Sequence, residues 1–194
     1  MLSAAEAGDT KQMISTLEYV QNINFANDEK VTALHKAAAK GHKDIVELLL
    51  ARGASTEALN KDNQTPLCLA AWNGNNGIVE LLLSKGASIQ AMSNEKSTPL
   101  HYAASTGRTR TVELLLSKGA SIDAMNSDGE TPLYDAVRSR RTNTVRLLLS
   151  KGASITTRNE DNETPLDLAT LFENQGAMKL LQDKAAELAS RGNI

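Results

Sequence analysis

A period of 33 residues runs through this 194-residue chain. Tetrapeptides that begin Thr-Pro-Leu, or Thr-Ala-Leu in the first copy, start at regular intervals at 32–35, 65–68, 98–101, 131–134 and 164–167. The nine residues Leu-Leu-Leu-Ser-Lys-Gly-Ala-Ser-Ile recur without change at 81–89, 114–122 and 147–155. A fixed period of this length indicates one small unit stacked many times, because a single unit cannot bury its own apolar face.

Each unit contains the start and stop signals of two short helices. In one copy, Thr65 can cap a helix that begins at Pro66, since proline suits the first helical position. Gly74 predicts the end of this helix at residue 73, because glycine readily takes the left-handed conformation there. A second helix is expected over 76–84, ended by the Lys-Gly pair that follows. The turn-rich segments between units are rich in Asn, Asp, Ser and Gly.

The copy at 98–107 reads Thr-Pro-Leu-His-x-Ala-Ala-x-x-Gly, and Val-Glu-Leu-Leu-Leu-x-x-Gly-Ala follows at 112–120. With its period, this pair of motifs resembles the ankyrin repeat over nearly the whole chain. The resemblance implies an all-α repeat protein, an α-solenoid of stacked helix-turn-helix units whose turn-rich segments project as β-turn fingers. It also implies that partner proteins bind in a concave groove formed by the first helices and the fingers.

The period predicts a single domain over 1–194. Residues 1–31 align with the later copies but carry Lys11, Gln12 and Glu18 on a surface expected to pack, which is typical of a terminal cap. Internal repeats are expected at 32–64, 65–97, 98–130 and 131–163. Residues 164–194 form the predicted C-terminal cap, with one longer helix over 178–190 that directs Lys184 and Glu187 outward.

Composition excludes several classes of protein. A net charge of −2 and 3% aromatic residues do not suit nucleic-acid binding, which uses basic stripes and stacking rings. The single cysteine excludes an intrachain disulfide, and no stretch is long and apolar enough to span a bilayer. The first residues lack the basic and apolar regions of a signal peptide. We expect an intracellular monomer, in the cytoplasm or the nucleus, that does not associate with membranes.

The sequence offers no catalytic, cofactor-binding or metal-binding set. His35 and His101 share one repeat position two repeats apart, which places them about 20 Å from each other on the spacing of packed helices, too far to share a metal. They are expected to hydrogen-bond within the turns, whereas His42 is expected to face solvent. Cys68, which replaces this histidine in its repeat, is expected to be a small buried residue and not a reactive thiol. We therefore expect a protein that is not an enzyme and takes no cofactor.

Residues that point away from the stack are free to bind a partner. If Leu67, Ala70 and Ala71 pack inward, helical spacing turns the positions of Leu69, Trp72 and Asn73 outward. Trp72 and Tyr102 are the strongest candidate anchors, although Trp72 could simply cover an adjacent helix. With the finger residues, the predicted partner-binding set is Asp28, Glu29, Lys36, Lys40, Lys61, Asp62, Gln64, Leu69, Trp72, Asn73, Glu95, Tyr102, Ser105, Thr106, Asp128, Glu130, Asp135 and Arg138.

Charge is distributed unevenly between the two edges of each repeat. The fingers hold nine acidic residues against three lysines, a local charge of −6; the acids are Asp28, Glu29, Asp62, Glu95, Asp128, Glu130, Glu160, Asp161 and Glu163. The turns between paired helices carry His42, Lys43, Arg108, Arg110, Arg140 and Arg141. This asymmetry predicts a partner with a basic patch that meets the fingers, in an interaction that salt weakens. The alternative is that the charges serve only solubility.

Arg140 interrupts the pattern of helix-stopping glycines, because it lies where Gly41, Gly74 and Gly107 end the equivalent helices. A non-glycine residue held in the left-handed region costs roughly 1 kcal/mol. Either the turn is remodelled, or the segment Arg138-Ser-Arg-Arg141 is retained for contact.

The sequence therefore predicts a non-catalytic module that binds a partner protein or peptide through its groove and acidic finger tips. Two alternatives remain open, an architectural spacer that binds nothing and an engineered, consensus-derived scaffold. The unchanged nine-residue blocks agree with an engineered origin, while Arg140, Cys68 and the irregular segment at 170–174 are unlike deliberate idealisation.

Overall fold

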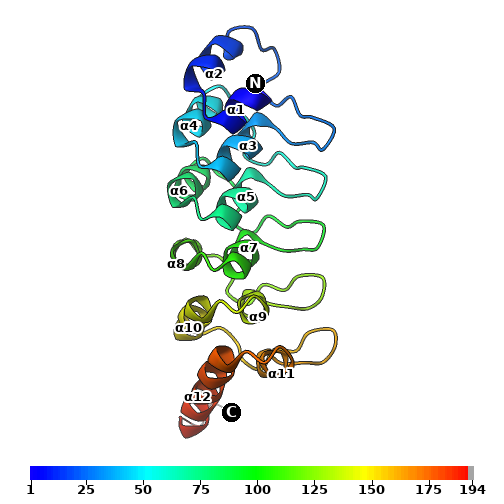
Figure 1. Ribbon diagram of the computed structural model, residues 1–194, viewed down its shortest axis with the longest axis vertical. Helices are drawn as coiled ribbons and strands as arrows, with labels where there is room; N and C mark the ends of the chain where they lie inside the picture. The colour runs from blue at the N-terminus through cyan, green and yellow to red at the C-terminus, as the bar shows by residue number, and fades with distance from the viewer. Residues whose placement is uncertain (192–194) are drawn as a thin grey trace.

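The computed structural model describes residues 1–191, and their secondary structure is a series of paired α-helices (Figure 1). The pairs are α1 (Leu2–Ala7) with α2 (Thr10–Leu17), α3 (Ala33–Lys40) with α4 (Lys43–Ala51), α5 (Pro66–Asn73) with α6 (Asn76–Ser84), α7 (Pro99–Thr106) with α8 (Thr109–Ser117), α9 (Pro132–Arg138) with α10 (Thr142–Ser150), and α11 (Pro165–Leu171) with α12 (Gln175–Ser190). The boundaries of α5 and α6 agree with the sequence prediction.

The six pairs stack into an elongated array with the two termini at opposite ends (Figure 1). Each first helix contacts the first helix of the next pair, from α1 through α11, and the second helices from α2 to α12 form a parallel column. The loops that join one pair to the next all project to the same side, beyond the first helices (Figure 1). The fold is thus all-α, and residues 1–191 contain no β-strand beyond one isolated bridge between Ala26 and Thr32.

The core lies between the layers and is aliphatic, as the sequence predicts. Leu67, Ala70 and Ala71 of α5 have no exposed surface, and neither do Val79 and Leu82 of α6. The small alanine side chains let successive first helices approach closely, while the leucines fill the space between them and the second helices. None of the helices in residues 1–191 combines the length and the apolarity that crossing a bilayer demands.

The start of each first helix is fixed by its threonine and by the residue three positions later. The Thr32 hydroxyl accepts a hydrogen bond from the backbone N–H of His35, and the backbone N–H of Thr32 donates to His35 Nδ1. Thr98 and His101 repeat this reciprocal arrangement. The other ring nitrogen of His101 donates to the carbonyl oxygen of Glu130, 3.1 Å away in the next finger. The histidine therefore ties its helix to the finger of the following unit.

The fingers are tight turns that are also linked to one another. In each, a backbone N–H bonds to the carbonyl four residues later, as from Asn60 to Gln64 (3.1 Å). Neighbouring tips are joined by single backbone hydrogen bonds, from Lys61 to Glu29 (3.0 Å), Asn94 to Asp62 (2.9 Å), Ser127 to Glu95 (2.8 Å) and Glu160 to Asp128 (2.9 Å). The fingers therefore form a connected edge along the stack.

A second series of contacts joins the turn of each pair to the pair before it. From α4 to α12, the side chain just before each second helix donates to a carbonyl near the end of the first helix of the preceding pair. The donors and acceptors are His42 to Glu6, Asn75 to Ala38, Arg108 to Trp72, Arg141 to Ser105 and Asn174 to Val137. Gly107 makes room for this series, because a Cβ added there would lie 2.8 Å from Cδ of Arg141. We call it the turn ladder.

Arg140 keeps the left-handed conformation of the glycines that it replaces. Its φ is +56°, whereas Gly107 has φ +75°, and α9 ends at Arg138, one residue earlier than its counterparts relative to the repeat. The Arg140 guanidinium donates to the carbonyl of Phe172 in the next unit at 2.6 Å. Of the two alternatives that the sequence leaves open, the structure shows the retained contact, with only the last residue of the helix changed.

The terminal helix pairs differ from the internal ones. In the first pair, Lys11, Gln12 and Glu18 are exposed, while Met13 is fully buried against the stack. In the last pair, α12 continues to Ser190 as the sequence predicts, but it begins at Gln175, three residues earlier than expected. Its early start has a local cause, because the Asn174 side chain accepts a hydrogen bond from the backbone N–H of Ala177. Lys184 and Glu187 form an ion pair of 2.9 Å along this helix.

Candidate functional site

The candidate site is the surface that the first helices and the fingers make together, which we call the inner face. Two contacts show that helices and fingers adjoin here: Gln64 Nε2 of one finger donates to Tyr102 Oη of α7 at 3.0 Å, and Arg138 of α9 pairs with Glu130 of another finger. The helix residues that the sequence assigns to this face all retain some exposure; Lys36, Leu69, Tyr102, Ser105, Thr106 and Asp135 are half-buried, and Lys40, Trp72, Asn73 and Arg138 are exposed.

Trp72 and Tyr102 form the aromatic centre of the inner face. Their ring centroids lie 5.7 Å apart with an interplanar angle of 57°, a tilted arrangement that aromatic pairs favour. Trp72 nevertheless keeps 46% of its surface exposed. It covers part of the neighbouring helix and still presents an apolar surface to solvent, so both interpretations of this residue describe part of what is observed.

Three further apolar side chains on the inner edge are missing from the sequence prediction. Leu59, Met92 and Met125 each precede the first residue of a finger, and they are 47%, 53% and 51% exposed. They are 33 residues apart, so the period itself could have revealed them as one equivalent position. The residue type alone does not reveal their exposure, because a lone methionine or leucine near a turn does not differ in sequence from a core residue.

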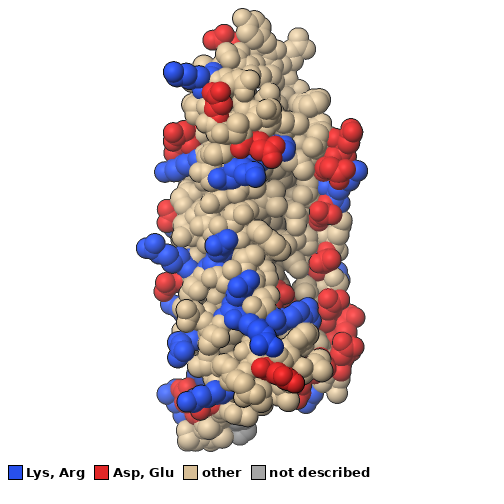
Figure 2. Space-filling model, in the orientation of Figure 1, with Lys and Arg blue, Asp and Glu red and all other residues tan. Residues whose placement is uncertain are grey.

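Acidic residues gather along the edge formed by the fingers, and several basic residues gather in the middle of the face seen in Figure 2. Asp28, Glu29, Asp62, Glu95 and Asp128 are exposed at the fingers, as is Lys61, while Gln64 is half-buried. Some of this charge is already paired, because Lys61 lies 2.9 Å from Glu29, and Lys36 lies 2.6 Å from Glu6. Lys36 is therefore not a free cation of the inner face.

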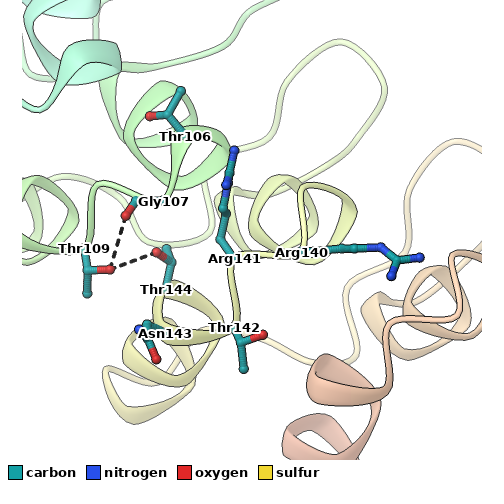
Figure 3. Close-up of a pocket in the computed structure, with 8 residues that line it drawn as sticks. All are labelled: Thr106, Gly107, Thr109, Arg140, Arg141, Thr142, Asn143 and Thr144. Atoms are coloured by element: carbon teal, nitrogen blue, oxygen red, sulfur yellow. Dashed lines mark hydrogen bonds between the residues drawn. The ribbon is translucent and has the colours of Figure 1, made fainter.

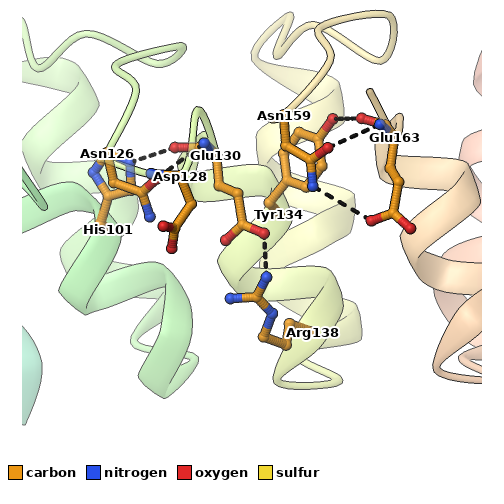
Figure 4. A network of polar contacts seen from close by, with 8 residues as sticks. All are labelled: His101, Asn126, Asp128, Glu130, Tyr134, Arg138, Asn159 and Glu163. Atoms are coloured by element: carbon orange, nitrogen blue, oxygen red, sulfur yellow. Dashed lines mark hydrogen bonds and ion pairs between the residues drawn. The ribbon is translucent and has the colours of Figure 1, made fainter. Parts of the chain in front are cut away.

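The structure corrects the expectation for Glu130, which is not an exposed acid of the finger tip. This residue is only 1% exposed, and its carboxylate pairs with the Arg138 guanidinium (Figure 4). Its carbonyl accepts the hydrogen bond from His101, which holds the end of the finger against α7. Of the nine acids predicted at the fingers, Glu130 is buried in an ion pair, and the other eight are exposed or half-buried. Burial raises the pKa of Glu130 in spite of the adjacent arginine.

Asp135, on the same face of α9 as Arg138, has a strongly shifted pKa. Burial and, after it, the negative charge of Glu130 raise the pKa of its carboxyl to about 7, while Arg138 acts in the opposite direction. A carboxyl with a pKa near neutrality is half protonated under physiological conditions. The charge of this group can therefore change in the neutral range.

The turns between paired helices hold a shallow depression lined by polar groups (Figure 3). Thr109 Oγ1 lies 3.1 Å from Thr144 Oγ1, and the guanidiniums of Arg140 and Arg141 extend in different directions from the same turn. Both arginines serve the architecture, since Arg141 belongs to the turn ladder and Arg140 bonds to Phe172. The basic edge predicted from the sequence is thus largely explained by packing between repeats.

The histidines and the cysteine have structural surroundings. His35 and His101 are buried, and burial lowers the pKa of both, to about 4 for His101. Burial also raises the pKa of the Cys68 thiol, which disfavours the reactive thiolate. Among residues 1–191, no group of three or more His, Cys, Asp or Glu side chains is arranged to hold a metal ion.

The family model described as Ankyrin repeats (3 copies) matches residues 1–93 and 89–159. These matches cover most of the chain, which therefore belongs to the ankyrin repeat family. The matched residues include the first four helix pairs and α9–α10, and the last pair stacks on them in the same way. No curated protein matches the chain. Domains of this family are generally protein-binding modules and are typically non-catalytic.

Proposed function

We propose that this chain is a non-catalytic module that binds another protein along its inner face, with Trp72 as the central anchor. The observation that carries the proposal is the exposure of Trp72, whose ring packs against Tyr102. Leu59, Met92 and Met125 are further exposed apolar side chains beside the fingers. Large apolar side chains that a packed array leaves in water favour a binding role, because aromatic anchors contribute most of the free energy in many interfaces.

The contrast between core and inner face supports the same proposal. Leu67, Leu100 and Leu133 occupy equivalent positions and are all fully buried. At the equivalent inner-face position the residue changes from Leu69 to Tyr102 in the next repeat, then to a carboxylate in the following one. Stacking requires the core positions to be uniform, but it does not constrain the inner-face positions. The inner face is therefore free to match a particular partner.

A binding assay with matched variants tests this function. Wild-type protein, Trp72→Ala and a control changed on the second-helix column, Glu80→Ala, are used to capture proteins from an extract of the source cells. Captured proteins are then purified and titrated while the emission of Trp72, the chain's single tryptophan, is followed. We expect a partner whose affinity falls at least roughly tenfold for Trp72→Ala and stays unchanged for Glu80→Ala.

Equal affinity of all three proteins for every captured partner would contradict the assignment of the inner face. Failure of the wild type to retain any protein would favour the architectural spacer. Thermal unfolding of Trp72→Ala serves as the folding control, because this side chain is 46% exposed and its loss should leave the core intact.

A further inference from the structure

We propose that the space between α7 and α9 on the inner face holds the guanidinium of an arginine side chain from the bound protein, between Glu130 and Asp135. This inference rests on the proposed function, since it assigns a chemistry to one position of the partner. It differs from a general attraction between acidic fingers and a basic surface, because it depends on two named carboxylates, one of them almost fully buried.

The first observation is the unsatisfied carboxylate of Glu130. Its side chain is 2% exposed; one oxygen, Oε1, meets Arg138, while Oε2 is buried and has no hydrogen-bond partner. A buried oxygen of this kind costs free energy unless a donor reaches it. Figure 4 shows the side chains of Glu130 and Asp128 both extending from the finger into the space between α7 and α9. The Asn159 side chain lies near enough to favour the charged form of this carboxyl, but it makes no hydrogen bond to Oε2, so a donor is missing there.

The second observation is the balance of charge around this oxygen. The charges of Glu130, Asp128 and Glu95 all act on Asp135, the charge of Asp128 also acts on Glu130, and Arg138 is the cation that acts on both Asp135 and Glu130. Four carboxyl groups thus share one guanidinium. A second cation brought by a partner would offset the repulsion that, after burial, raises the pKa of Asp135.

The geometry favours a guanidinium over a metal ion. Within residues 1–191 the acidic groups do not converge in the way that metal ligands do. A planar guanidinium has five N–H donors in a fixed fork, so it can bond to two carboxylates at once, which the single ammonium of lysine does less well. Arg138, whose side chain is 43% exposed, already pairs with the other oxygen of Glu130, so it competes with the incoming group for this carboxylate.

Binding at this position is expected to depend on pH. The charged and titratable groups that face Asp135 are Glu95, Asp128 and Glu130 from the fingers and Arg138 from its own helix. His101 and Tyr134 bond to finger carbonyls nearby, and their pKa values of about 4 and about 12 keep both neutral near pH 7. Asp135, with a pKa of about 7, ionises between pH 6 and 8, so affinity for a cation should rise over that range.

The test uses the full chain and an acetylated peptide of alternating arginine and glycine, with lysine and citrulline versions as probes. Binding is measured by NMR titration at pH 6 and pH 8. We expect the arginine peptide to bind more tightly than the lysine peptide, and the citrulline peptide, which is uncharged, not to bind. Asp135→Asn and Glu130→Gln should each weaken binding of the arginine peptide at pH 8 by roughly fivefold or more. Asp161→Asn, at an exposed finger acid away from the cluster, should change it less than about twofold.

Two further outcomes separate this site from the general charge of the fingers. Arg138→Gln removes the competing cation and should tighten binding, and Asp135→Asn should abolish the gain between pH 6 and pH 8. If Asp135→Asn and Asp161→Asn have the same effect, or if lysine serves as well as arginine, the inference is wrong. The arginine site would then be refuted, whereas the proposed function would still be supported if Trp72→Ala weakens binding of a captured partner. The thermal stability of each variant shows that the chain remains folded.

Discussion

One position in the repeat is occupied by different residues that make different hydrogen bonds. His35, Cys68, His101, Tyr134 and Asp167 each follow the capping threonine by three residues. The two histidines close the capping box and reach the next finger, and Tyr134 reaches the carbonyl of Glu163 in its own next finger through its hydroxyl. Cys68 bonds only to Thr65. The position therefore tolerates substitution, but its contribution to stability differs from one repeat to another.

The buried histidines make stability depend on pH. The pKa of His101 is lowered from 6.5 to about 4 by burial, so below pH 6.5 the unfolded chain binds a proton that the folded chain does not. Its contribution to the free energy of unfolding is complete above pH 6.5 and is lost as pH falls toward 4, by about 3 kcal/mol at most. We expect His101→Cys, which copies the residue of the preceding repeat, to flatten this dependence, as measured by urea denaturation at pH 7.5 and pH 4.5.

The comparison is made as the difference between wild type and variant, because Asp135 acts in the opposite direction. Its raised pKa favours the folded state as pH falls from about 7. His42→Cys is the matched control, since the His42 ring bonds only to the carbonyl of Glu6 at a partly exposed site. If His101→Cys loses the same stability at both pH values, the neutral buried histidine is not the cause of the acid sensitivity.

At the residue scale, the sequence predicts caps and helix stops well, because these depend on neighbours within four positions. Thr65, Pro66 and Gly74 all act as predicted. The burial of Glu130 is not predictable in the same way. It depends on the hydrogen bond from His101, 29 residues earlier, and on Arg138 in the next helix. Only the folded arrangement brings these three residues together.

At the scale of the element, the left-handed turn that follows α9 carries a measurable strain. Arg140 has φ +56° where the equivalent residues are glycines, and its side chain bonds to Phe172. We expect Arg140→Gly to be more stable than Arg140→Ala by about 1 kcal/mol, because both lose the hydrogen bond and only glycine relieves the backbone. The difference is measured by thermal and urea unfolding. Equal stability of the two variants would mean that the alanine backbone has left the left-handed region.

The elements themselves follow the sequence closely where the period is regular, and less closely at the ends. The bounds of α5 and α6 are predicted to the residue. By contrast, α12 begins before its predicted start, at Gln175, which lies 33 residues after the start of α10 and follows the Asn174 cap. The inner-face residues are placed on the surface as predicted, but Leu59, Met92 and Met125 are recognised only once their exposure is known. Whether any of them contacts a partner stays a prediction.

At the scale of the whole molecule, each pair of helices depends only on its neighbours, so damage should stay local. The main packing contacts of α12 are with α10 and α11. Leu181→Ala removes a side chain that is 1% exposed and should cost about 2–5 kcal/mol in the last pair. Hydrogen exchange should then show faster opening of α11 and α12, with little change in α3 to α5.

The matched control is Leu100→Ala, in the middle of the stack, where the lost side chain is fully buried between pairs on both sides. Its effect should spread to both neighbours and lower the stability of the whole array. A uniform loss of protection in Leu181→Ala, equal to that in Leu100→Ala, would show that the array unfolds as one cooperative unit.

The turn ladder also bears on how long such a molecule can become. Arg108 lies against Gly74 and Arg141 lies against Gly107, so neighbouring units meet through interchangeable junctions. A second copy of residues 98–130 inserted before Thr131 would find a matching glycine behind it and a matching arginine ahead of it. Duplication of this unit therefore requires no compensating change in either flanking unit, so the stack can be lengthened without altering the existing repeats.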